Sequence, residues 1–164
     1  MSVYNFFASN AVLESVINEK VFFFSFNEAL ERGIKIPWNI ADKDKKNTIL
    51  YVKNREDLDE IEISPGHMID DENNYTKMKY RASLHWVYTE KRAEQLLDYI
   101  KQHLQKTNEI ELWKIWLGEK EKPDIICCKL CDLDNKKIKS IFGKNGFKKP
   151  LCLKVIKDGK CQDE

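Results

Sequence analysis

The chain has 164 residues, of which 42% are hydrophobic, 34% charged and 11% aromatic, and its formal net charge is +1. This composition excludes a disordered chain, and the length is sufficient to bury roughly 70% of the unfolded surface in one core. Apolar runs such as Val21–Phe24 are far below the roughly 20 residues that span a bilayer. The first ten residues lack the basic start and apolar stretch of a secretory signal, so we predict a cytoplasmic protein without a membrane partner.

The first half of the chain, residues 1–75, predicts an irregular and strand-rich segment. Aromatic and β-branched residues favour strands, and NEALERG favours a short helix closed by Gly33. The predicted strands cover residues 3–9, 20–26, 47–53 and 59–64. No linker rich in Pro, Ser or Gly separates this half from the rest, so we predict a single domain over residues 1–164.

The second half, residues 79–157, predicts a strand, helix and strand in that order, followed by a weaker repeat of the same pattern. Alternation over residues 79–88 predicts a half-buried strand with Ala82, Leu84 and Trp86 on its inner face. Thr89 is a suitable N-cap for an amphipathic helix that ends by Asn108. The apolar stripe of that helix contains Ala93, Leu96, Leu97, Ile100 and Leu104. Residues 109–118 follow as an inner strand that is apolar on both faces.

The repeat consists of a strand over residues 125–130, a short helix over 134–142 and a strand over 151–157. Asp132 or Asp134 is the predicted N-cap, and Gly143 is predicted to end the helix through a left-handed cap. The order β-α-β-β-α-β is that of a ferredoxin-like unit. The predicted fold is therefore α+β, with a mixed or antiparallel sheet and helices packed on it.

The motif CCKLC at residues 127–131 is the best candidate for thiol or metal chemistry. Cys128 and Cys131 have the spacing of half a zinc knuckle, but no second half follows, because Cys152 and Cys161 are too far apart. If residues 125–130 form a strand, Cys127 and Cys128 point to opposite faces, which favours structural cysteines over a zinc or redox site. An odd count of five cysteines predicts free thiols, and Cys131, beside a lysine-rich helix, is the one whose reactivity we would test.

Other catalytic patterns are absent from the sequence. The six glycines form neither a P-loop nor a dinucleotide-binding fingerprint, and His85 and His103 are predicted on the surface. His67 with Asp70, Asp71 and Glu72 could gather around a hard cation, although a solvated acidic loop is favoured. We therefore predict no catalytic residues and no cofactor, which favours a non-catalytic protein over an enzyme.

Charge is segregated along the chain, and this segregation motivates the functional hypotheses. Eight acids and no Lys or Arg lie between Glu56 and Glu72, whereas nine lysines and a single acid lie between Lys136 and Lys160. The candidate binding face contains Lys136, Lys137, Lys139, Lys144, Lys148 and Lys149. The first hypothesis is a binding or interaction protein with another protein as its partner. The second is weak binding of RNA or single-stranded nucleic acid, and the third is a thiol or zinc-dependent activity at Cys128 and Cys131.

Three segments carry a resemblance to known sequences: YNFFAS at residues 4–9, HWVYTEKRAEQLLDYI at 85–100 and ELWKIWLGE at 111–119. In these segments the chain resembles a set of small, uncharacterised bacterial proteins. The resemblance implies a bacterial cytoplasmic setting and brings no activity with it. The sequence itself does not specify an oligomeric state.

Overall fold

The computed structural model describes residues 3–36, 48–66, 75–118, 121–143 and 149–157. The chain forms two compact units, one from residues 1–17 and 60–164 and the other from residues 18–59. We call the first the sheet unit and the second the ribbon unit. A compact unit of this kind need not fold alone, so the predicted single domain over residues 1–164 stays a prediction.

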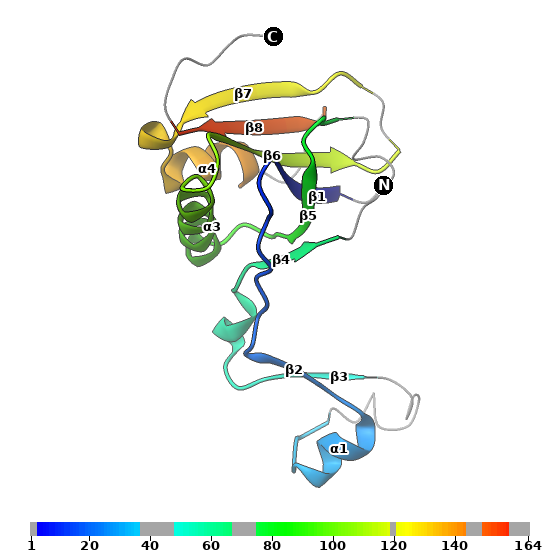
Figure 1. Ribbon diagram of the computed structural model, residues 1–164. Helices are drawn as coiled ribbons and strands as arrows, with labels where there is room; N and C mark the ends of the chain where they lie inside the picture. Colours follow the sequence, from blue (N-terminus) through cyan, green and yellow to red (C-terminus); the bar gives the residue numbers. More distant parts are fainter. Residues whose placement is uncertain (1–2, 37–47, 67–74, 119–120, 144–148, 158–164) are drawn as a thin grey trace. The chain divides into compact units, whose positions relative to one another are not determined.

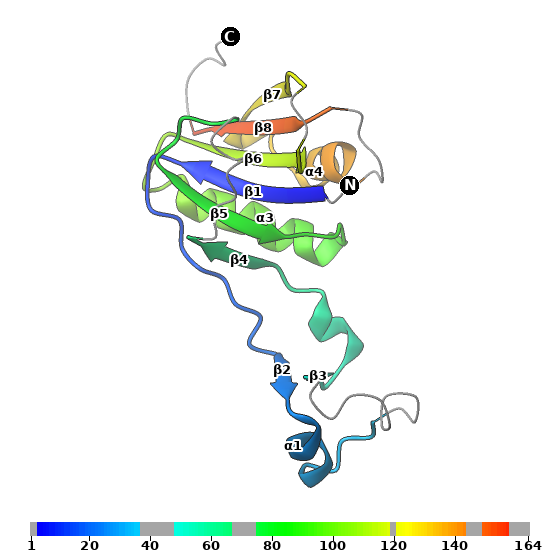
Figure 2. The same ribbon diagram turned by 90° about the vertical axis from the view of Figure 1, so that its right-hand side faces the viewer.

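The sheet unit contains a mixed sheet of six strands in the order β4-β5-β1-β6-β8-β7 (Figures 1 and 2). The strands are β4 (Glu62–Pro65), β5 (Tyr80–His85), β1 (Val3–Ser9), β6 (Glu109–Trp116), β8 (Leu151–Ile156) and β7 (Asp124–Lys129). Neighbouring strands are antiparallel except β7 and β8, which are parallel. The predicted α+β class with a mixed sheet is confirmed.

Two helices connect strands of this sheet and lie on one of its faces (Figure 2). Helix α3 (Glu90–His103) follows β5, and helix α4 (Asn135–Phe142) follows β7 and the short turn η3 (Leu130–Asp132). Thr89 caps α3 by accepting from the Arg92 amide at 3.2 Å, and Asp134 caps α4 by accepting from the Lys137 amide at 2.7 Å. Gly143 ends α4 with φ −75°, in the right-handed region, so the predicted left-handed cap is wrong.

The ferredoxin-like arrangement of residues 79–157 is not confirmed. In such a unit β7 would lie between β5 and β6, whereas the structure places β1 there. Strands β5 and β6 are both antiparallel to β1, so they are parallel to each other with one strand between them. A strand from the distant N-terminal segment therefore completes the sheet, which local periodicity cannot indicate.

The main core lies between the helices and the sheet. Its fully or almost fully buried members include Phe7, Ala82, Leu96, Ile100, Leu112, Ile138 and Leu153. Trp86 and Tyr88 are partly buried against it, as the alternation over residues 79–88 predicts. The opposite face has a smaller cluster in which the Phe6 and Trp113 rings stack at 5.9 Å. Strand β6 is thus covered on both faces, as predicted.

The ribbon unit is built around two short strands, β2 (Val21–Phe24) and β3 (Ile49–Val52), which pair antiparallel. Helix α1 (Phe26–Glu31) follows β2, and a 3₁₀ turn, η1 (Arg55–Leu58), follows β3. Ser25 and Glu28 form a capping box at the start of α1, and Gly33 follows the helix with φ 69°, as expected for a terminating glycine. Among the described residues of this unit, the buried apolar side chains are Phe26 and Ala29.

Candidate functional site

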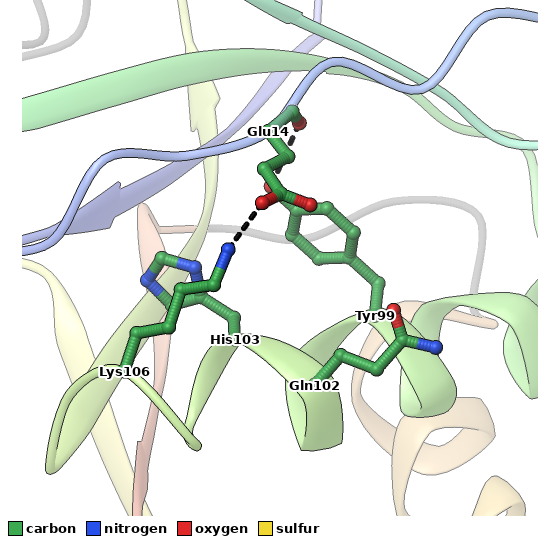
Figure 3. A pocket seen from close by; sticks show the side chains of 5 residues that line it. All are labelled: Glu14, Tyr99, Gln102, His103 and Lys106. Atoms are coloured by element: carbon green, nitrogen blue, oxygen red, sulfur yellow. Dashed lines mark hydrogen bonds and ion pairs between the residues drawn. The ribbon is translucent and has the colours of Figure 1, made fainter.

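A small hollow lies beside α3 in the sheet unit (Figure 3). It has a volume of about 110 Å³ and is lined by Glu14, Tyr99, Gln102, His103 and Lys106. The Lys106 ammonium forms an ion pair with the Glu14 carboxylate, and the Tyr99 hydroxyl donates to the Glu14 carbonyl at 3.0 Å. These contacts attach the segment after β1 to the end of α3.

His103 is buried in this hollow, so its predicted surface position is wrong. Only 4% of the residue is exposed, and its Nε2 lies 2.7 Å from the Ser9 hydroxyl. Ser9 is 0% exposed and its hydroxyl oxygen also accepts from the Ala11 amide at 3.1 Å, so this hydroxyl has two partners inside the protein. Burial lowers the pKa of His103, and the nearby Lys106 lowers it further. The neutral imidazole therefore links strand β1 to α3 through its hydrogen bond with Ser9. Because Ser9 is 0% exposed, a substrate cannot reach its hydroxyl.

A more open groove adjoins this hollow along α3. It has a volume of about 240 Å³ and shares Tyr99 and Gln102 with its neighbour. The Glu60 carboxylate, which lines this groove, accepts from Lys91 at 3.0 Å and from Gln95 at 2.6 Å. The Gln95 side chain in turn accepts from the Ile61 amide at 2.9 Å. The polar groups here hold residues 60–61 against α3.

The cysteines are separated by the pleat of β7, as predicted. Cys128 pairs with Val155 on the helix-covered face and is buried, whereas Cys127 pairs with Lys154 on the other face. Burial raises the pKa of the Cys128 and Cys152 thiols, and Cys131 is exposed in η3. Cys128, Cys131 and Cys152 are free, but Cys127 is disulfide-bonded, so the prediction of free thiols is wrong for that residue.

The described residues contain no group of three or more His, Cys, Asp or Glu side chains placed to hold a metal ion. Cys131 is near enough to Cys128 to contribute to the raised pKa of its thiol. Within the described ranges, no further His, Cys, Asp or Glu side chain completes a metal site with these two cysteines. The predicted alternative around His67, Asp70, Asp71 and Glu72 lies outside the described residues.

The lysines of the predicted binding face are partly compensated by acids of the same unit. Lys139 on α4 lies 2.7 Å from the Glu90 carboxylate and over the Tyr88 ring, and Lys149 lies 4.0 Å from Asp124. Lys136 is exposed and Lys137 half-buried on α4, whereas Lys144 and Lys148 lie outside the described residues. Acids that pair with these lysines leave less positive charge for a phosphate backbone.

Among the described residues, half of the ten exposed large apolar side chains belong to the ribbon unit: Phe22, Phe23, Leu30, Leu50 and Leu58. All eight residues of β2 and β3 are apolar, and none of them is buried by the described residues. The cross-strand pairs Val21–Val52 and Phe23–Leu50 share one side of the ribbon, and Phe22–Tyr51 and Phe24–Ile49 share the other. Phe23 is 65% exposed, Leu50 50% and Phe22 46%.

The two sides of this ribbon differ in how far the unit itself covers them. On one side the Phe22 and Phe24 rings stack at 6.1 Å, and the Arg32 guanidinium lies 4.6 Å from the centre of the Phe24 ring. The other side, formed by Val21, Phe23, Leu50 and Val52, contains the two most exposed apolar residues of the ribbon. We call this four-residue surface the Phe23 face. It is the candidate binding surface.

Sequence reasoning predicted β2 and β3 as strands but did not identify them as a surface. The signal was present: two four-residue strands, VFFF and ILYV, carry apolar residues at every position, whereas a half-buried strand alternates with polar ones. Such a pattern normally indicates a strand buried on both faces, and a two-stranded ribbon lacks the layers that would bury it.

Comparisons with protein-family models, curated proteins and solved structures found no match. The resemblance to small bacterial proteins therefore stays a prediction. Within the described ranges, none of the helices is long and apolar enough to cross a membrane.

Proposed function

We propose that the protein is a non-catalytic binding protein that docks a protein partner through the ribbon unit. The observation that supports this proposal is the exposure of the Phe23 face, since Phe23 and Leu50 are 65% and 50% exposed. Large contiguous apolar patches are uncommon on monomeric soluble proteins and commonly mark interaction sites. Aromatic anchors such as Phe23 are also enriched in protein–protein interfaces.

The polar hollows of the sheet unit support the non-catalytic part of the proposal. The carboxylate of Glu60 and the hydroxyls of Ser9 and Tyr99 are all engaged by internal partners. A site for bond-making chemistry needs polar groups that converge on a substrate, whereas these groups hold chain segments together.

An affinity capture from cell lysate tests this proposal. The wild-type chain and the Phe23→Glu variant are immobilised side by side at 0.15 and 0.5 M NaCl. We expect specific proteins to be retained by the wild type at both salt concentrations and lost from the variant, because apolar contacts are not screened by salt. Val87→Glu is the matched control, since Val87 is 69% exposed but belongs to the sheet unit.

Two results would count against docking at the ribbon. Equal capture by the wild type and Phe23→Glu would show that the partner binds elsewhere. Capture of nucleic acid that disappears at 0.5 M NaCl and in Lys136→Ala/Lys149→Ala would instead support the lysine face, because each phosphate contact releases counterions.

A cytoplasmic and bacterial setting is part of the proposal and rests on the sequence alone. The disulfide at Cys127 is unusual for a reducing compartment. Trapping thiols with a maleimide in intact cells before lysis tests the setting, and a Cys127 thiol that is modified in the cells would support the cytoplasm.

A further inference from the structure

We infer that the partner of the Phe23 face is a second copy of this chain, so that the protein associates through its ribbon unit into a symmetric dimer. This inference rests on the proposed function and specifies the occupant of the same surface. In a twofold dimer one patch meets its own copy, so the patch must be complementary to itself. The Phe23 face satisfies this condition because Val21, Phe23, Leu50 and Val52 are uncharged and apolar.

Charge supports a second copy over a charged partner. Residues 18–59 contain eight acidic and eight basic residues, so the formal charge of the ribbon unit is zero. Two such units experience no net repulsion, and a net charge near zero favours association. An acidic or basic partner, by contrast, gains no net electrostatic attraction from this unit.

The stability of the ribbon also favours a covering layer. A two-stranded sheet is marginal in water unless a further layer packs on it. Within the described part of the unit, Phe26 and Ala29 of helix α1 are buried, while Phe23 and Leu50 stay exposed. The ribbon of a second copy, packed on the Phe23 face, supplies that layer with the same side chains. Each chain contributes one ribbon, so two chains cover each other.

The size of the surface sets the strength of the expected dimer. A fully exposed Phe side chain presents roughly 200 Å², and Phe23, the largest side chain of the Phe23 face, is 65% exposed. Even with Leu50, the described ribbon contributes less than the roughly 800 Å² per partner of a standard stable interface. We therefore expect a concentration-dependent dimer with a Kd in the micromolar range, roughly 1–100 μM.

Sedimentation equilibrium of the full chain between about 1 and 200 μM, the range that brackets this Kd, tests the inference. We expect the apparent mass to rise from the 19.4 kDa of the monomer towards twice that value. Phe23→Glu places two carboxylates in the symmetric interface, so we expect its Kd to rise at least tenfold. Val87→Glu has the same charge change at a similarly exposed position of the sheet unit and is expected to dimerise like the wild type.

A second measurement does not depend on how a charged variant folds. Phe23 is replaced by the photoreactive residue p-benzoylphenylalanine in a mixture of ¹⁵N-labelled and unlabelled chains, and the cross-linked peptides are identified by mass. We expect mixed-isotope cross-links from position 23 to residues 21–24 or 48–59 of the second copy. Cross-links to the sheet unit of the second copy would overturn the symmetric ribbon contact.

The remaining outcomes separate this inference from the proposed function. A wild-type chain that stays at 19.4 kDa up to 200 μM, but captures another protein only when Phe23 is intact, overturns the dimer and leaves the proposed function standing. If Phe23→Glu leaves the Kd of the dimer unchanged, the dimer forms through a surface other than the Phe23 face. A monomer that captures nothing overturns both.

Discussion

At the scale of single residues, His103 shows how burial converts a polar side chain into a structural contact. Its imidazole is held between the Tyr99 ring, which stacks on it at 6.2 Å, and the Ser9 hydroxyl at 2.7 Å. Burial and the Lys106 ammonium lower the pKa of this imidazole, whereas the Glu14 carboxylate has a smaller effect in the opposite direction. Protonation of His103 therefore opposes folding.

We expect the free energy of unfolding to decrease as the pH falls below about 6.5, the ordinary pKa of histidine. The folded pKa is lowered, so the unfolded chain binds the proton first, and the stabilising effect is complete above the unfolded pKa. Urea unfolding at pH 8, 6.5 and 5 measures this slope. His103→Gln should flatten it in this pH range.

The matched control for this experiment is His85→Gln, because His85 is exposed on β5. That variant should keep the slope of the wild type. Equal slopes for the wild type and His103→Gln would contradict a neutral His103 in the folded chain.

The cysteines give a second test at this scale. Without reductant, we expect a maleimide to modify Cys131 in the native chain well before Cys128 or Cys152, because burial restricts access to the latter two and raises the pKa of their thiols. Peptide mapping by mass spectrometry identifies each modified residue. Early modification of Cys128 or Cys152 would show that the sheet opens locally, and addition of urea provides the positive control.

At the scale of elements, the start of helix α3 is capped by a single side chain, that of Thr89. The Thr89 hydroxyl accepts from the Arg92 amide, which would otherwise lack a partner in the first turn. We expect Thr89→Ala to reduce the free energy of unfolding by about 1 kcal/mol. The midpoint of urea unfolding measures the loss.

Thr89→Ser is the control for this substitution, since serine keeps the accepting oxygen. It should retain most of the stability that alanine loses. Similar losses for both variants would assign the effect of Thr89 to the packing of its methyl group instead of its cap.

Elements were the level at which the sequence was most informative. Helix α3 could be predicted because Ala93, Leu96 and Ile100 recur at helical spacing after a capping residue. Strand β7 could be predicted as well, and the alternation correctly separated Cys127 from Cys128. His103 was misplaced because a histidine on a mostly charged helix is normally exposed, and its partner Ser9 is 94 residues away.

The strand order and the exposure of the Phe23 face could not be predicted, for a related reason, although the two apolar strands that form this face could. Insertion of β1 between β5 and β6 depends on pairs such as Phe6–Ser83 and Phe6–Trp113, which are remote in sequence. Exposure of Phe23 likewise depends on the absence of a covering layer among the described residues, and periodicity reports which side chains are apolar, not what covers them.

At the scale of the whole molecule, the proposed dimer has a distinctive dependence on conditions. Association driven by apolar surface weakens on cooling and is insensitive to moderate NaCl, whereas association between charged faces weakens as salt is added. We expect the apparent mass at a fixed concentration to be lower at 4 °C than at 25 °C and unchanged between 0.1 and 0.5 M NaCl. Light scattering coupled to size exclusion measures both dependences.

Sodium sulfate provides the converse condition, because it is excluded from protein surfaces and strengthens apolar burial. The wild type should gain mass in sulfate, and Phe23→Glu should respond less. A dimer that dissociates in 0.5 M NaCl would point to the lysines of α4 as its contact.

The central place of β1 has a consequence for how the protein is made. Its backbone pairs only with β5 and β6, so residues 3–9 leave the ribosome long before residues 80–85 and 109–116 exist to receive them. Until then the segment of β1, with its two adjacent phenylalanines, lacks the strands β5 and β6 that later cover it. Sheets that depend on pairing between residues remote in sequence also fold slowly. Slower synthesis of the residues between β1 and β6 would lengthen this interval, and chaperones that bind nascent segments would have more time to bind the strand that later lies in the middle of the sheet.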